Sequence, residues 1–269
     1  MSTIRVAVAS TPLTRTLEEA VPAAVAAVEE AGRLGARIVC LPETTLPGHR
    51  DQPDPVADVG AEALEEALAE VAAAAGRAGV VAIVGTERPT AAGLEILSVV
   101  FDADGSRLGE QVKTQIDPAE ERWYVAGQGR RTFVAAGLTF GIAICHEAYR
   151  YPEVTRALAL SGAQVVFVPH YVVTDDGSLP TRWCDAHNPY NEKALLVRAL
   201  ENTIYIAAAN NAGPAQGSIT GIIAPDGTLV ASLPYGEVGV AAADIDLVAA
   251  DRLIARRWDP ERSLPALPG

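Results

Sequence analysis

The chain has 269 residues, 49% of them hydrophobic and 20% charged, which is the composition of a globular protein and not of a disordered one. Its formal net charge of −13 argues against nucleic acid or an anionic membrane surface as a partner, because either would need a basic face. The sequence contains no apolar run of membrane-spanning length and no signal-peptide layout. Three widely spaced cysteines form neither a disulfide framework nor a zinc motif, so we expect a reducing, cytoplasmic setting.

The first half of the chain alternates between predicted strands and helices. Short apolar runs predict strands, and Ala- and Glu-rich stretches with a helical period predict helices. In chain order the elements are strand 4–10, helix 17–35, strand 37–43, helix 61–79, strand 80–87 and a hairpin over 94–113 that turns at "DADG", 102–105.

The second half continues the alternation after a polar, irregular stretch. Its elements are strand 131–145, helix 151–163, strand 164–170, helix 188–203, strand 204–210, a hairpin over 217–234 that turns at "PDG", and a last apolar run at 238–247. Strands alternating with helices predict a layered α/β fold, and the two hairpins predict mixed sheets. No linker or low-complexity tract divides the chain, so we expect a single domain over residues 1–269.

Three predicted strand ends carry residues that a buried strand does not need. Glu43 follows "IVCLP", Lys113 follows "GEQV", and Cys145 follows "GIAI". Each has an ordinary explanation as a cap, an exposed lysine or a core cysteine. In α/β proteins, however, chemistry concentrates where strands end and loops begin.

Together these three residue types fit one reaction. Attack on an amide or nitrile carbon needs a thiolate, a base that generates it, and a cation or N–H donors for the negative charge that develops. Cys145, Glu43 and Lys113 would supply the thiolate, the base and the cation. The sequence therefore predicts a hydrolytic site built from these side chains.

The same residues lie in segments that resemble the signature stretches of the nitrilase, or carbon–nitrogen hydrolase, superfamily. These are "LPETTLPGH", "KTQIDPAEERWYVAGQ" and "GIAICHEAYRYPE", followed by "RALENTIYIAAANNAG" and "GSITGIIAPDG". The resemblance spans almost the whole chain. It implies a four-layer α-β-β-α sandwich with two mixed sheets, no cofactor, and pairing into a homodimer or a higher homo-oligomer.

The resemblance also implies roles for single residues. Glu43 would be the general base, Lys113 the group that stabilises the charged intermediate, and Cys145 the nucleophile. Relatives commonly carry a second glutamate between the lysine and the cysteine. The resemblance selects Glu120 for this role, because an aromatic residue follows it by four positions and a glycine by seven; Glu121 remains an alternative.

The segment after the cysteine departs from the common pattern. It is one residue longer before Pro152-Glu153, and His146 stands where true nitrilases have a tryptophan, which favours amides over nitriles. The backbone N–H of His146 is the expected second oxyanion donor. A Cys145–His146 dyad is disfavoured, because neighbouring residues at a strand end point opposite ways. Glu147 and Arg150 are expected to form a structural ion pair.

A polar, aromatic segment after the strand 164–170 offers substrate-binding candidates, because a loop at that strand end could border the site. They are His170, Tyr171, Trp183 and Asn188. No metal is expected, since the four histidines show no close ligand spacing. Cys40 and Cys184 are expected to be inert.

The sequence thus predicts a hydrolase that cleaves a non-peptide C–N bond of a small carboxamide or N-carbamoyl compound through a cysteine thioester. Two alternatives stay open: a nitrilase acting on small nitriles, and a catalytically silent binding protein with the same fold.

Overall fold

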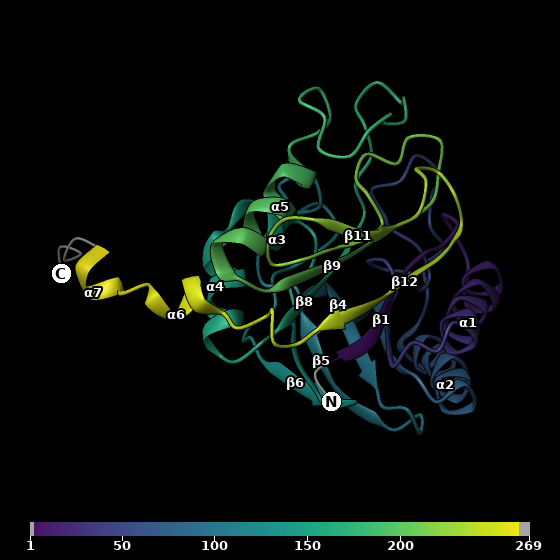
Figure 1. The fold of residues 1–269 in the computed structure, drawn as a ribbon. Helices are drawn as coiled ribbons and strands as arrows, with labels where there is room; N and C mark the ends of the chain where they lie inside the picture. Colours follow the sequence, from purple (N-terminus) through teal and green to yellow (C-terminus); the bar gives the residue numbers. More distant parts are fainter. Residues whose placement is uncertain (1–2, 264–269) are drawn as a thin grey trace.

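Two six-stranded sheets form the centre of the protein (Figure 1). The structure is a computed structural model that describes residues 3–263. The first sheet has the strand order β12-β1-β2-β3-β4-β5. Its strands are β1 (Thr3–Ser10), β2 (Ile38–Cys40), β3 (Val81–Thr90), β4 (Gly93–Phe101), β5 (Arg107–Val112) and β12 (Gly239–Asp246). β1, β2 and β3 are parallel, and the hairpin predicted over 94–113 forms the antiparallel pair β4–β5.

The second sheet has the order β11-β10-β9-β8-β7-β6. Its strands are β6 (Thr132–Ala135), β7 (Leu138–Ile142), β8 (Val165–His170), β9 (Tyr205–Asn210), β10 (Gly221–Ile223) and β11 (Leu229–Ser232). β7, β8 and β9 are parallel, and the flanking strands pair antiparallel. Both sheets are therefore mixed, as the two hairpin signals predict.

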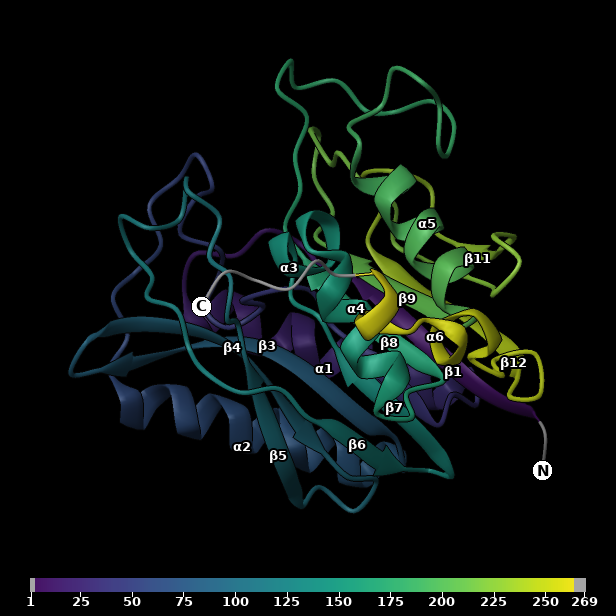
Figure 2. The same cartoon turned by 90° about the vertical axis from the view of Figure 1, so that its left-hand side faces the viewer.

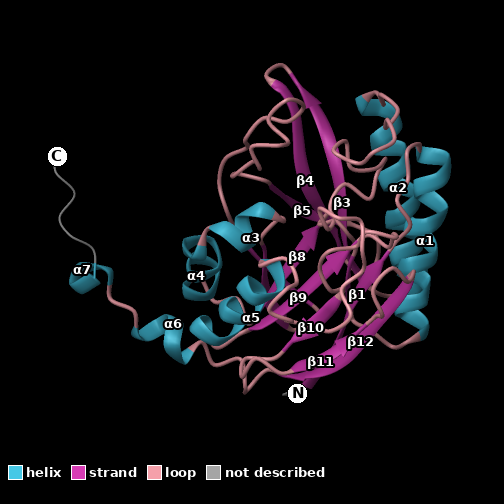
Figure 3. Ribbon diagram, turned by 90° about the horizontal axis from the view of Figure 1, so that it is seen from above, coloured by secondary structure: helices cyan, strands magenta, loops and turns pink. Residues whose placement is uncertain are grey.

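Helices cover the outer face of each sheet, which Figures 2 and 3 show from two further directions. On one side lie α1 (Leu17–Arg33) and α2 (Ala61–Ala78); on the other lie α3 (His146–Arg150), α4 (Pro152–Leu160) and α5 (Asn191–Asn202). One cluster of buried side chains joins α1 and α2 to the first sheet, and another fills the space between the sheets and under α3–α5. This arrangement confirms the predicted four-layer α-β-β-α sandwich.

The helix boundaries follow from local signals. The Thr16 side chain accepts a hydrogen bond from the Glu19 amide at 3.3 Å and so caps α1. α2 ends at Gly79, whose positive φ of 65° suits a residue without a Cβ. Two short helices, α6 (Leu253–Arg257) and α7 (Pro260–Ser263), lie in the C-terminal tail, for which the sequence pattern predicts no helix.

No helix within residues 3–263 combines the length and the hydropathy that a bilayer crossing requires.

The predicted strand over 131–145 is instead a hairpin, β6–β7, whose second strand ends at Ile142. Positive φ angles at Ala136 and Gly137 make the turn between the two strands. Beyond Ile142 the chain still runs beside β8, and the Cys145 amide donates to the Pro169 carbonyl at 3.0 Å. Cys145 is therefore held by the second sheet although it lies outside a regular strand.

Candidate active site

Lys113 lies between two carboxylates in the interior. It directly follows β5, and its amide donates to the Ile96 carbonyl of β4 at 2.8 Å. Its Nζ is 2.7 Å from Glu43 Oε1 and 2.6 Å from Glu120 Oε2, and its side chain is fully buried. Burial alone would lower the pKa of the Lys113 ammonium, but the negative charges around it, that of Glu43 foremost, hold this pKa above its ordinary value. Lys113 is thus a permanent cation.

Glu43 sits on a tight turn three residues after β2. Its Oε2 accepts a hydrogen bond from the Tyr171 amide at 3.2 Å, so the first residue after β8 in the second sheet helps to orient a carboxylate of the first. The turn presses against β3 at Gly85: a Cβ there would lie 2.1 Å from the Pro42 carbonyl oxygen and 2.7 Å from the Thr44 amide nitrogen. Only glycine leaves room for the turn that carries Glu43.

We expect Gly85→Ala to destabilise the protein by about 3 kcal/mol and to lower activity, because the added methyl group must displace the turn that carries Glu43. Urea unfolding and steady-state kinetics measure the two effects. Gly60→Ala is the matched control, since a Cβ at that position meets no atom within 4 Å. Equal stability and activity of both variants would contradict this account of the turn.

Glu120 is the second carboxylate of the cluster, whereas its neighbour Glu121 is exposed. Glu120 Oε2 also accepts from the Asp117 amide at 3.2 Å. Burial alone would raise the pKa of Glu120, but the hydrogen bond from His49 and the charge of Lys113 lower it to about 2. Of the two glutamates that the sequence leaves open, Glu120 is the one beside Lys113.

Cys145 occupies a strained position between β7 and α3. Its φ of 51° and ψ of −112° are unusual for a residue with a side chain, and such strain is typical of a nucleophile on a strand-to-helix turn. Cys145 lines a cavity of about 290 Å³, and its Sγ lies 3.6 Å from the Tyr171 carbonyl oxygen. Burial and the charge of Glu43 raise the pKa of the thiol well above its usual value, although Lys113 acts in the opposite direction. Burial therefore favours the neutral thiol over the thiolate.

His49, for which the sequence predicts no role, completes the cluster. Its Nε2 is 3.1 Å from Glu120 Oε1 and 3.6 Å from Glu43 Oε2. Its ring stacks on Tyr171 with centroids 4.3 Å apart. His49 closes the segment "LPGH" that follows Glu43, but nothing in that spacing shows that the ring turns back toward two glutamates.

Ligand atoms of Glu43, His49 and Glu120 lie within 4.8 Å of one another, close enough to hold a metal ion. Both carboxylates already bind the Lys113 ammonium, however. A divalent cation in this group would face a permanent positive charge at short range, which Coulomb repulsion disfavours. The geometry therefore fits an ammonium-centred cluster better than a metal site.

Glu147 ties the Lys113 segment to the Cys145 turn. Its Oε1 accepts from the Thr114 amide and hydroxyl, both at 2.6 Å, and from Arg130 Nη2 at 2.7 Å. Its Oε2 accepts from the Ile144 amide at 3.0 Å. The ion pair expected between Glu147 and Arg150 is thus wrong. Glu147 points into the core, whereas Arg150 is exposed, with its guanidinium 4.1 Å from the centre of the Tyr190 ring.

We expect Glu147→Gln to cost about 3 kcal/mol of unfolding free energy, because it removes the charge that compensates Arg130 and turns an amide donor toward other donors. Activity should fall with it, since Thr114 and Ile144 are the chain neighbours of Lys113 and Cys145. Thermal and urea unfolding together with kinetics measure both effects. The exposed Glu121→Gln is the control, and equal behaviour of the two variants would refute the bridging role.

Of the other predicted site residues, some line the cavity at Cys145 and others do not. Tyr171 and His146 line the Cys145 cavity, and His146 Nδ1 is 2.7 Å from Asp117 Oδ2. His170 is fully buried, and burial lowers the pKa of its imidazole to about 4. Trp183 borders a separate hollow near Tyr235, and neither His170 nor Trp183 is among the described residues around the Cys145 cavity.

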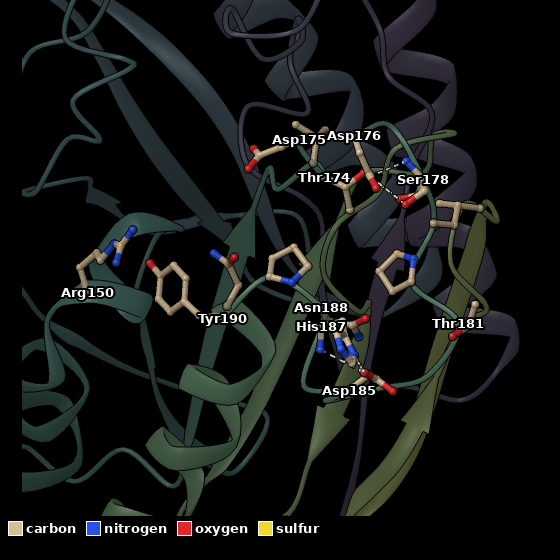
Figure 4. Close-up of a pocket in the computed structure, with 15 residues that line it drawn as sticks. Arg150, Thr174, Asp175, Asp176, Ser178, Thr181, Asp185, His187, Asn188 and Tyr190 are labelled. Carbon is tan, nitrogen blue, oxygen red and sulfur yellow. Dashed lines mark hydrogen bonds and ion pairs between the residues drawn. The ribbon is translucent and has the colours of Figure 1, made fainter.

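A larger pocket of about 820 Å³ adjoins this cavity and is lined mainly by the loop between β8 and α5 (Figure 4). Arg150 and Tyr190, side by side at one end of the view, line both spaces. Asn188 and Asp185 lie on the far side of Tyr190 from Arg150 in this view. The loop proposed for specificity therefore walls a pocket that shares Arg150 and Tyr190 with the Cys145 cavity.

A buried ammonium shared by two carboxylates, beside a cysteine on a strained turn, defines an enzyme with a cysteine nucleophile. The profile of the carbon–nitrogen hydrolase family matches residues 5–255. The chain belongs to this family, as the signature segments predict.

Individual relatives are distant. A nitrilase from Pyrococcus abyssi is 28% identical over 235 residues, which cover 84% of each chain. An (R)-stereoselective amidase from Pseudomonas sp is 28% identical over 52% of this chain and 45% of its own length. The crystal structure of an amidase from Nesterenkonia sp. superposes with a TM-score of 0.78 at 24% identity, covering 96% of this chain and 94% of that one. In a variant of that amidase, the acetamide moiety of fluoroacetamide is bound covalently to the active-site cysteine.

Proposed function

We propose that this enzyme hydrolyses a small carboxamide to the acid and ammonia through a thioester on Cys145. The observation that carries the proposal is the position of Lys113 Nζ between Glu43 and Glu120, in the cluster whose charges act on the Cys145 thiol. The amidases among the relatives support an amide as the substrate class, and they leave the particular amide open.

In the first half-reaction Glu43 accepts the proton of the Cys145 thiol as the sulfur attacks the carbonyl carbon. The carbonyl oxygen becomes negative, and the Lys113 ammonium and the His146 amide stabilise it. Among residues 3–263 that amide makes no hydrogen bond outside its own helix, and His146 lines the cavity, so the donor can serve a ligand. Collapse of the intermediate breaks the C–N bond, and the leaving nitrogen takes its proton from Glu43, giving ammonia and the thioester.

In the second half-reaction a water molecule gives its proton to Glu43 and attacks the thioester carbon. The new tetrahedral intermediate expels the Cys145 thiolate, which regains a proton from Glu43, and the acid leaves. Because the pKa of the thiol is raised, transfer of its proton to Glu43 during attack fits this site better than a standing thiolate.

A nitrile is the second candidate substrate, because the Pyrococcus abyssi nitrilase matches 84% of both chains. Assays of acid and ammonia release on matched amide and nitrile pairs, such as butyramide and butyronitrile, separate the two. We expect turnover of the amide and a mass increase of one acyl group on Cys145 when the reaction is quenched. Preference for the nitrile, or a thiol that gains no acyl group, would overturn the proposal. A silent binding protein would have no use for the complete buried cluster.

We also propose that this single-domain enzyme forms a homodimer or larger homo-oligomer in the cytoplasm. Cys40, Cys145 and Cys184 are all free thiols, which a reducing compartment preserves. Light scattering after size-exclusion chromatography measures the oligomeric state.

A further inference from the structure

The proposed hydrolysis gives a task to Glu43, Lys113 and Cys145 but none to His49, although His49 is buried against both carboxylates. Each glutamate offers one oxygen to Lys113 and directs the other toward His49 Nε2. The two side chains therefore bridge the same pair of carboxylates from opposite sides. Among residues 3–263, His49 is the only hydrogen-bond partner of Glu120 Oε1.

The loop that carries His49 is held firmly in place. The Thr14 hydroxyl donates to the Pro47 carbonyl at 2.9 Å, and the Gln52 amide group donates to the Thr14 carbonyl at 2.7 Å. Between them, Gly48 has a φ of 152°, and a Cβ there would lie 2.0 Å from the Thr14 carbonyl oxygen. The position of the imidazole is thus set before any substrate binds, as a pre-organised site requires.

The hydrogen bonds also assign the tautomer of His49. The Asp51 amide donates to Nδ1 at 3.3 Å, so Nδ1 carries a lone pair and not a proton. The Nε2–H is then donated to Glu120 Oε1, so His49 acts as a hydrogen-bond donor to that carboxylate.

We propose that His49 is a positioning residue that keeps Glu120 ionised and thereby leaves Glu43 as the proton acceptor for Cys145. Two carboxylates that share one ammonium compete for a proton, and the environment decides which of them takes it. Glu120 receives donors from His49, Lys113 and the Asp117 amide, which favour its charged form. Glu43 likewise binds Lys113 and accepts from the Tyr171 amide at 3.2 Å, but its Oε2 is 3.6 Å from His49 Nε2, beyond hydrogen-bond distance. This inference rests on the proposed function.

Loss of the His49 donor raises the pKa of Glu120, because a hydrogen bond to a carboxylate favours its ionised form. Glu120 then competes with Glu43 for the proton of the Cys145 thiol. As a result, the acid limb of the pH–rate profile moves to higher pH. The titratable groups around the ring are Glu43, Asp51, Lys113, Glu120, Tyr124 and Tyr171. The same groups surround position 49 in each variant below. A difference in pH dependence between the variants therefore reports the loss of the hydrogen-bond donor.

The test compares His49→Leu, which removes the donor, with His49→Gln, whose amide group restores it. For an amide substrate we expect His49→Leu to lower kcat roughly tenfold or more at neutral pH, with KM changed by less than about threefold. The apparent pKa of the acid limb of the kcat/KM profile should be about one unit higher in His49→Leu and should stay near the wild-type value in His49→Gln. The exposed Glu121→Gln, which lines neither the outer pocket nor the Cys145 cavity, is the control.

A second readout does not depend on turnover: the rate at which iodoacetamide alkylates Cys145, followed by mass spectrometry from about pH 5 to about pH 9. We expect its acid limb to shift in His49→Leu and not in His49→Gln. An unchanged alkylation profile in His49→Leu, or equal defects in both variants, would overturn the inference and leave His49 as a packing partner of Tyr171. If the wild type hydrolyses no amide but the alkylation profile still shifts, the proposed function fails and the positioning role stands.

Discussion

Cys145→Ala is expected to abolish amide hydrolysis while leaving the fold intact. No other group among residues 3–263 can form the thioester at this position, so the loss should be on the order of 10⁴-fold or more. Stability should change little, because alanine keeps the Cβ and the positive φ of 51°. In the part of the chain that the structure describes, the Sγ makes one contact of hydrogen-bond type, at 3.6 Å. Ammonia release measures turnover, and circular dichroism with thermal unfolding measures the fold.

Cys184→Ala is the matched control for this experiment. Cys184 is half-buried, its backbone amide binds Glu192, and its side chain does not line the Cys145 cavity. We expect this variant to retain wild-type activity. Turnover of Cys145→Ala within tenfold of the wild type would remove Cys145 as the nucleophile, and with it the thioester mechanism.

Lys113→Met is expected to damage both stability and activity. Methionine has a similar length but no charge, so two buried carboxylates would face each other without the cation that compensates them. Breaking a buried pair by removing one partner costs about 3–5 kcal/mol. Activity should fall on the order of a hundredfold or more, as it does when an oxyanion-stabilising group is lost.

The destabilisation by Lys113→Met should depend on pH in a defined direction. In the wild type the pKa of Glu120 is lowered to about 2, so its contribution to stability is present above its unfolded pKa and is lost as the pH falls toward 2. Without Lys113 the two carboxylates repel each other, and the folded pKa of one of them rises above its unfolded value. Protonation then relieves the repulsion, so the variant should recover stability as the pH falls.

Urea unfolding at about pH 5 and about pH 8 measures this effect as the difference between variant and wild type. Lys193→Met is the control, because within residues 3–263 the Lys193 ammonium binds only backbone carbonyls on the loop before α5. A destabilisation by Lys113→Met that is the same at both pH values would show that the lost interaction is packing and not charge.

The sequence by itself predicted the layers of the fold and the chemistry of the site. Alternation of apolar strands with helical segments is a local pattern, and it survives folding because each segment buries its own apolar face. Glu43, Lys113 and Cys145 were recognisable because each breaks such a pattern at a strand end. The order of the signature segments added the family, and the spacing of Tyr124 and Gly127 within one of them added the choice of Glu120.

Contacts between segments distant in the sequence could only be decided by the tertiary structure. Glu147 binds Arg130, 17 positions away, and not the nearby Arg150, because the turn after Cys145 points its carboxylate into the core. His49 reaches Glu120 across 71 positions. Spacing along the chain carries no information about such pairs, since the packing of the two sheets and the course of their loops place the atoms. The sequence thus determined which groups are present, and the packing of the sheets decided how they share protons.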